Sequence, residues 1–248
     1  MITLKSPAEI ALMRAAGRIL VAALEDVRKI IAPGVTTLAL DRAAARSITE
    51  RGGYPAFLGY EGFPANICTS VNDEVVHGIP DERVLQEGDI VSVDLGVIYQ
   101  GYYADAAWTF PVGEVDPEAR RLMQVTEESL YRGIAQARVG NHLSDISHAI
   151  QEYVEKNGFS VVREYVGHGI GTHMHEEPQV PNFGPPGRGM ILREGLCLAI
   201  EPMVNAGTWE VRQLANGWTV VTKDHRLSAH FEHTIAVTAA GPVVLTSA

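Results

Sequence analysis

The sequence predicts an α+β fold in which helices cover a mainly antiparallel sheet. The helical segments come in pairs, and runs of strand-like segments follow each pair. The glycines that end these helices repeat as well, because Gly34 and Gly140 are as far apart as Gly52 and Gly158. A duplicated helix–helix–strand unit would give two similar halves with a site between them. Coincidence between two ordinary helix pairs explains the spacing equally well.

The hydrophobic periodicity predicts four helices, near residues 7–31, 37–52, 117–138 and 143–158. The first has a complete start signal, with Ser6 as N-cap, Pro7 in the first turn and Glu9 at the third position. Strand-like segments fall near 65–70, 89–98, 102–111, 160–166, 195–201, 208–213, 217–222 and 229–238.

The composition indicates one globular domain spanning residues 1–248, with similar halves at about 1–110 and 111–248. A net charge of −10 argues against a nucleic-acid surface, which would need basic patches. Cys68 and Cys197 are too few for a disulfide framework. The sequence has no leader pattern and no apolar run long enough to span a membrane, so we expect a cytoplasmic protein without membrane contact.

Four carboxylates interrupt apolar strands, where acidic residues are depleted. They are Asp94, Asp105, Glu201 and Glu232. A turn centred between Tyr99 and Gln100 would place Asp94 directly opposite Asp105, although Gly101 can shift that register. Two adjacent anions destabilise each other unless a cation lies between them or one is protonated.

The segment YVGHGIGTHMHEEPQV, residues 165–180, adds three histidines in a glycine-rich stretch. A metal, a charged substrate or solvent would each account for such a cluster. Four carboxylates with one imidazole suit Mn, Fe, Co or Zn better than Ca alone. Because so many anions exceed the charge of one divalent ion, we expect a pair of ions. A single strand carboxylate, taken alone, would more often face solvent.

Such a pair of ions favours hydrolysis, because it lowers the pKa of water and polarises a carbonyl. Amide, phosphate and ester substrates all fit this chemistry. An acidic site disfavours phosphate, which usually needs Arg or Lys clamps, and favours a substrate with a positive amine.

Several motifs together resemble the type I methionine aminopeptidases of peptidase family M24, which have the creatinase/aminopeptidase or pita-bread fold. The motifs are VDLG, the Asp94-to-Asp105 spacing, NDEVVHGIP, GHGIG, HMHEEP, AIEP and FEHT. The short interval between Glu201 and Glu232 leaves no room for the insertion typical of type II. The resemblance implies two pseudo-symmetric halves around a curved, mainly antiparallel sheet.

The resemblance also implies a set of metal ligands for two divalent ions, with Co, Mn, Fe and Zn as candidates. The five ligands would be Asp94, Asp105, His168, Glu201 and Glu232. Asp105 and Glu232 would bridge the ions, and Glu201 would also act as general base. His77 and His175 would hydrogen-bond to the substrate and its tetrahedral intermediate. His173 has no implied role and is expected to face solvent.

The methionine side chain would occupy a pocket, again by resemblance. Its lining would be Tyr60, Phe63, Cys68, Met174 and Trp218. Ordinary core packing would place the same residues together. Met174 and Phe63 depart from the common bacterial pattern, which has Phe and Tyr there.

The resemblance implies removal of the initiator methionine from nascent chains when the second residue is small. We expect a monomer that meets nascent N-termini and contacts the ribosome transiently. The alternatives are a Xaa-Pro aminopeptidase or prolidase, whose relatives generally carry an extra N-terminal domain, and a non-catalytic binding protein of the same fold. The intact ligand set argues against the binding protein.

Overall fold

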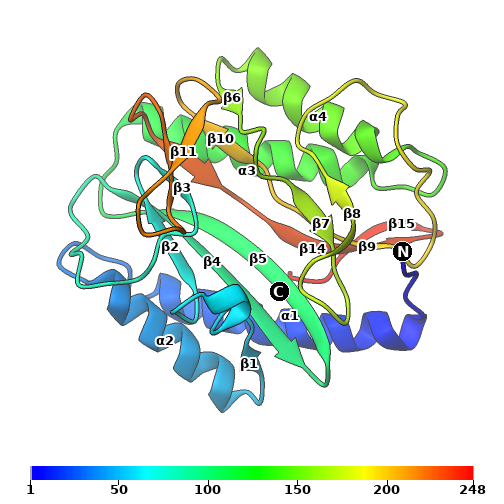
Figure 1. Cartoon of the computed structure of the whole chain (residues 1–248), viewed down its shortest axis with the longest axis horizontal. Coiled ribbons are helices and arrows are strands. Elements are labelled where there is room, and N and C mark those ends of the chain that lie inside the picture. The colour runs from blue at the N-terminus through cyan, green and yellow to red at the C-terminus, as the bar shows by residue number, and fades with distance from the viewer. Residues whose placement is uncertain (1, 248) are drawn as a thin grey trace.

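The computed structural model describes residues 2–247, and it places two pairs of helices on either side of a group of strands (Figure 1). In the view of Figure 1 the first pair lies along the lower edge and the second pair along the upper edge. The helices are α1 (Pro7–Arg28), α2 (Thr37–Glu50), α3 (Pro117–Gln136) and α4 (Leu143–Lys156). Within residues 2–247, no helix has both the length and the apolar character that a bilayer crossing requires.

All four predicted helices are confirmed, with ends two or three residues shorter than expected. At the start of α1 the Ser6 N–H donates to the Glu9 carboxylate at 2.7 Å, and the Glu9 N–H donates back to Ser6 Oγ at 3.4 Å. This reciprocal pair is the capping box that the sequence predicted. Gly52 and Gly158 follow α2 and α4 with φ values of 79° and 81°, a conformation that favours glycine after a helix.

In the described part of the chain the strands form four antiparallel groups. The first consists of β1 (Tyr54–Pro55), β2 (Cys68–Val71), β4 (Ile90–Tyr99) and β5 (Tyr102–Pro111). The second consists of β7 (Gly167–Gly169), β8 (Glu176–Val180), β9 (Cys197–Ile200), β14 (His233–Thr238) and β15 (Gly241–Val244). The third consists of β3 (Glu74–Val76), β11 (Val211–Gln213) and β12 (Val220–Thr222). The fourth consists of β6 (Ser160–Val161), β10 (Met203–Asn205) and β13 (Ser228–His230). The antiparallel α+β class is therefore confirmed.

Each helix pair buries its apolar face in a core of its own. Leu20 and Val27 of α1 join Leu40 and Ile48 of α2 and the valines of β4 in one cluster. A second cluster holds α3 and α4 against the strands of the other half. Burying one such aliphatic side chain stabilises the fold by about 1.5–3 kcal/mol. The extent of the single domain, residues 1–248, stays a prediction.

The β4–β5 hairpin corrects the expected pairing of its two aspartates. Asp94 lies opposite Ala107, and Asp105 lies opposite Gly96. The turn residues are Gln100 and Gly101, which both have positive φ, at 47° and 82°. A two-residue hairpin turn of this kind needs positive φ at both positions, so the glycine sets the register. Because the shift is two residues, both carboxylates stay on one face as diagonal neighbours.

The strand expected at 229–238 is broken in two, which is a second correction. β13 ends at His230 and β14 begins at His233. Between them the Glu232 N–H donates to the Ala107 carbonyl of β5 at 2.9 Å, where the chain passes from the group that contains β13 to the group that contains β14. The expected strand at 160–166 also shrinks to β6, and the short strands β1, β3, β7, β8, β10 and β15 were not predicted.

Candidate metal centre and active site

The five predicted ligands come from five separate places in the chain and meet between the two halves. Asp94 lies in β4, Asp105 in β5 and His168 in β7, Glu201 follows β9, and Glu232 precedes β14. They line one cavity of about 150 Å³. The structure therefore brings together the whole predicted ligand set.

Hydrogen bonds between the halves fix the position of Asp105. Its backbone N–H donates to Thr234 Oγ1 at 2.9 Å, and the Thr234 hydroxyl donates to the Asp105 carbonyl at 2.8 Å. On the other side, β7 is irregular between His168 and Gly169, where its pairing with β8 shifts register. An irregularity of this kind re-aims a side chain, here the imidazole.

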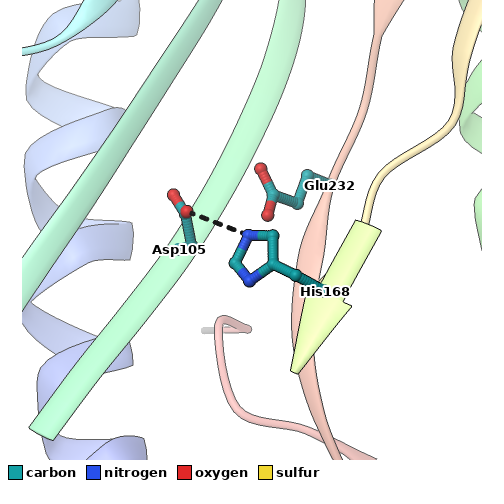
Figure 2. A group of neighbouring side chains, drawn as sticks. All are labelled: Asp105, His168 and Glu232. Atoms are coloured by element: carbon teal, nitrogen blue, oxygen red, sulfur yellow. Dashed lines mark ion pairs between the residues drawn. The ribbon is translucent and has the colours of Figure 1, made fainter. Parts of the chain in front are cut away.

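The His168 imidazole points with Nε2 toward carboxylates, as Figure 2 shows for Asp105 and Glu232. The His168 Nε2 atom lies 3.8 Å from Asp105 Oδ2 and 3.6 Å from Glu201 Oε1. Its Nδ1 atom lies 2.9 Å from the Gly169 carbonyl, which fixes Nδ1 as the donor. Ligand atoms of Asp105, His168 and Glu232 all lie within 4.8 Å of one another. Imidazoles that bind metals typically donate their other N–H in this way.

The carboxylates carry strongly raised pKa values. Burial raises the pKa of Asp94 to about 7, and it raises the pKa of Asp105, Glu201 and Glu232 well above the ordinary carboxyl value. Repulsion from the neighbouring carboxylates adds to the effect for the last three. Buried oxygens of Asp94, Asp105 and Glu232 also have no hydrogen-bond partner. Divalent cations would supply both the missing charge and the missing partners, so the donor set fits a metal centre.

His77 and His175 line the same cavity. The His77 backbone has φ of 60°, an uncommon conformation for a residue with a side chain. Burial and the neighbouring His175 lower the pKa of His77 to about 4, and burial also lowers the pKa of His175. Nδ1 of His175 lies 2.7 Å from the Tyr60 hydroxyl. Both imidazoles are therefore neutral near pH 7 and able to donate one hydrogen bond.

An aromatic and sulfur-containing wall completes the cavity. The predicted pocket residues all line it: Tyr60, Phe63, Cys68, Met174 and Trp218. The Phe63 and Trp218 rings pack edge to face with centroids 5.1 Å apart. Burial raises the pKa of the Cys68 thiol well above its ordinary value, so the thiol is no ready nucleophile.

The structure adds residues that the sequence did not predict. Phe57 and Glu61 also line the cavity, and His230 points at Glu201 and Glu232 from the end of β13. The sequence held a signal for His230, because residues two apart in a strand, such as His230 and Glu232, face the same side. His173 is exposed, as expected.

Comparison with known proteins identifies the family to which the chain belongs. The model of metallopeptidase family M24 matches residues 11–239. The chain belongs to this family. Within family M24 the chain is 54% identical to methionine aminopeptidase 1 of Bacillus subtilis, over 99% of both chains.

Solved M24 structures agree with this assignment. Methionine aminopeptidase from Thermotoga maritima covers 100% of both chains at 49% identity and a TM-score of 0.99. The prolidase from Pyrococcus furiosus matches 99% of this chain but 65% of its own, at 20% identity and a TM-score of 0.80, which shows a shared fold alone. The M24 chain described here therefore has the predicted pita-bread fold.

Proposed function

We propose that this M24 chain is a methionine aminopeptidase that removes the N-terminal methionine from peptides and nascent proteins, with a preference for a small second residue. One observation carries the proposal: four carboxylates and an imidazole lie beside a pocket lined by aromatic and sulfur-containing side chains. The similarity to methionine aminopeptidases over the full chain supports the same reaction.

The five predicted ligands would hold a pair of divalent ions, for which Asp105 and Glu232 would each supply oxygens. Four carboxylates balance the charge of two divalent ions, and Co, Mn, Fe and Zn all accept this donor set. When bound, such ions lower the pKa of water toward about 7 and polarise the scissile carbonyl.

Glu201 serves as general base in this proposal, because it lies within the carboxylate cluster and its carboxyl holds a proton readily. Burial and the neighbouring carboxylates Asp105 and Asp94 raise its pKa. In the ionised form it accepts a proton from the attacking water, and in the protonated form it passes that proton to the leaving amine.

His175 and His77 serve as neutral donors to the substrate. Burial raises the pKa of the Tyr60 phenol, which therefore stays protonated and donates to Nδ1 of His175. That bond leaves the hydrogen on Nε2 of His175, where it can reach a substrate carbonyl. Such donors stabilise the oxyanion that forms during hydrolysis.

The pocket wall selects methionine by shape and by sulfur–aromatic contact. Phe63 and Trp218 offer ring edges and faces, and Met174 offers a flexible thioether. A thioether substrate gains about 0.3–1.5 kcal/mol from each favourable contact between sulfur and an aromatic ring.

Release of methionine from Met-Ala-Ser tests the proposal, measured with each of Co, Mn, Fe and Zn and compared with an Ala-Pro dipeptide. We expect cleavage of Met-Ala-Ser, slower cleavage of Met-Leu-Ser and none of Ala-Pro. Cleavage of Ala-Pro alone would favour a prolidase. No turnover of any peptide with any of the four metals would favour a binding protein.

We further propose that the protein is cytoplasmic, because its nascent substrates arise at the ribosome, and that it is a monomer, as the family resemblance implies. Transient contact with the ribosome would follow from the same substrate. Sedimentation of the purified protein alone tests the monomer, and sedimentation with ribosomes tests the contact.

A further inference from the structure

His230 is a buried histidine whose Nε2 atom has no hydrogen-bond partner. The residue is 1% exposed, and Nε2 is among the buried polar atoms left unsatisfied. A buried polar atom without a partner is uncommon, because its desolvation costs free energy. The atom lies 3.7 Å from Glu201 Oε2 and 4.0 Å from Glu232 Oε2. It therefore faces the metal centre.

The backbone around His230 is held firmly in this position. The His230 N–H donates to Thr109 Oγ1 at 2.9 Å, and the Thr109 hydroxyl donates to the His230 carbonyl at 2.8 Å. His230 also pairs with Met203 in the β10–β13 ladder. Strand pairing therefore fixes the face of the strand from which the buried imidazole projects.

The Nε2 atoms of His230 and His168 lie at similar distances from neighbouring carboxylate oxygens. The His168 Nε2 atom lies 3.6 Å from Oε1 of Glu201, and the His230 Nε2 atom lies 3.7 Å from Oε2 of the same side chain. Each oxygen of Glu201 therefore faces one imidazole. Among residues 2–247 there are two groups of potential ligands, and they share Glu232. They are Asp105, His168 and Glu232, and Glu201, His230 and Glu232.

These distances fit a shared ion better than a hydrogen bond. A nitrogen–oxygen hydrogen bond spans about 2.7–3.2 Å, so 3.7 Å and 4.0 Å are too long. Two atoms that each bind one ion at about 2.1 Å can lie up to about 4.2 Å apart. A neutral imidazole also adds a ligand without adding charge to a site that already has four carboxylates.

We propose that His230 is a sixth side-chain ligand of the metal centre, binding through Nε2 a divalent ion that Glu201 and Glu232 also hold. The inference rests on the proposed metal-dependent function and extends its ligand set from one imidazole to two. With His230 as an additional ligand, the ion between Glu201 and Glu232 is bound more tightly than it would be by the carboxylates and His168 without His230.

The number of imidazoles bound to the metal tests this assignment. Metal-free protein is loaded with two equivalents of Co(II), and X-ray absorption fine structure gives the imidazoles per ion. Proton NMR of the same samples counts the shifted imidazole N–H signals. We expect two metal-bound imidazoles per wild-type chain and one in His230→Gln. The exposed His225 lies outside the cavity, so His225→Gln should keep two.

Metal affinity gives a second measurement, by competition with a chelator. We expect His230→Gln to bind the more weakly held Co(II) ion at least about 10-fold less tightly than wild type. Reduced affinity with an unchanged imidazole count would mean that His230 acts only by orienting Glu201, which overturns the ligand assignment.

The wild-type protein decides the question if the variant fails to fold, which circular dichroism of the metal-free form would reveal. One bound imidazole in the wild type overturns the inference without any variant. Failure of the wild type to bind Co(II) at all would instead overturn the proposed function.

Discussion

Lys5 and Glu176 form an ion pair that is almost closed to solvent, with side-chain exposures of 3% and 11%. The other carboxylate oxygen of Glu176, Oε1, accepts the backbone N–H groups of Thr172 and His173, at 2.9 Å and 3.3 Å. The segment before α1 is therefore tied to the loop that carries Met174 and His175. This loop supplies both a pocket wall and a substrate-side histidine.

Replacing Lys5 with Met should destabilise the protein, because Glu176 would remain buried without its cation. Breaking a buried pair costs about 3–5 kcal/mol, or about 6–20 °C in Tm at this chain length. Calorimetry of Lys5→Met measures the change. The exposed pair of Lys29 with Asp26 gives the control, since Lys29→Met should cost less than about 1 kcal/mol. Equal losses in the two variants would refute the role of the buried pair.

The stability of the metal-free protein should fall as pH rises from about 6.5 to 8.5. Burial raises the pKa of Asp94 to about 7 and that of Asp105, Glu201 and Glu232 further above normal. The stability from a raised carboxyl pKa is complete below the unfolded pKa, near 4, and is lost as pH rises through the folded pKa.

The buried histidines make the free energy of unfolding rise with pH, and they do so only at lower pH. The pKa values of His77 and His168 are lowered to about 4, so their contribution is complete above the unfolded value of about 6.5. Above that pH the histidines no longer oppose the carboxylates, so the free energy of unfolding falls. For each proton that the folded state holds and the unfolded state has lost, the free energy of unfolding falls by about 1.4 kcal/mol per pH unit. Thermal unfolding with and without Mn tests this, and we expect the metal-loaded protein to keep its Tm. A metal-free Tm that rises over this range would contradict the assignment.

Glu201→Gln should abolish most hydrolysis while peptide binding survives. The amide keeps an oxygen ligand but cannot take a proton, so we expect kcat to fall by about 10²–10⁴-fold. Stopped assays give kcat, and calorimetric titration with Met-Ala-Ser gives Kd for the metal-loaded variant. Near-normal turnover would remove Glu201 from the mechanism.

His77→Asn should lower kcat/KM by about 10²–10³-fold and leave metal content unchanged. Asparagine tolerates the positive φ of this position, so the variant separates the role of the ring from that of the backbone. His77→Ala should show the same kinetic loss. Metal analysis alongside the assay decides the role, because loss of an ion in His77→Asn would make His77 a ligand.

Much of this site could be predicted from the sequence, because acidic residues in apolar strands are rare. Asp94, Asp105 and Glu232 were noticeable for that reason, and His168 for its place in a glycine-rich segment. The α+β class followed from helix pairs and strand runs, which depend on local periodicity.

The rest depended on geometry that local periodicity does not encode. The β4–β5 register depended on the positive φ of Gln100 and Gly101, and the usual turn preferences do not favour Gln there. His230 was passed over because the break at Phe231 and Glu232 arises from pairing with the distant β5. Short strands such as β7 exist only through their neighbours.

Diffraction from crystals grown with Mn most directly tests whether five distant side chains hold a pair of divalent ions. We predict two anomalous difference peaks per chain, about 3.5–4 Å apart. Both should lie among Asp94, Asp105, His168, Glu201 and Glu232. Well-ordered crystals with no peak among these side chains, at Mn concentrations that support activity, would contradict the account.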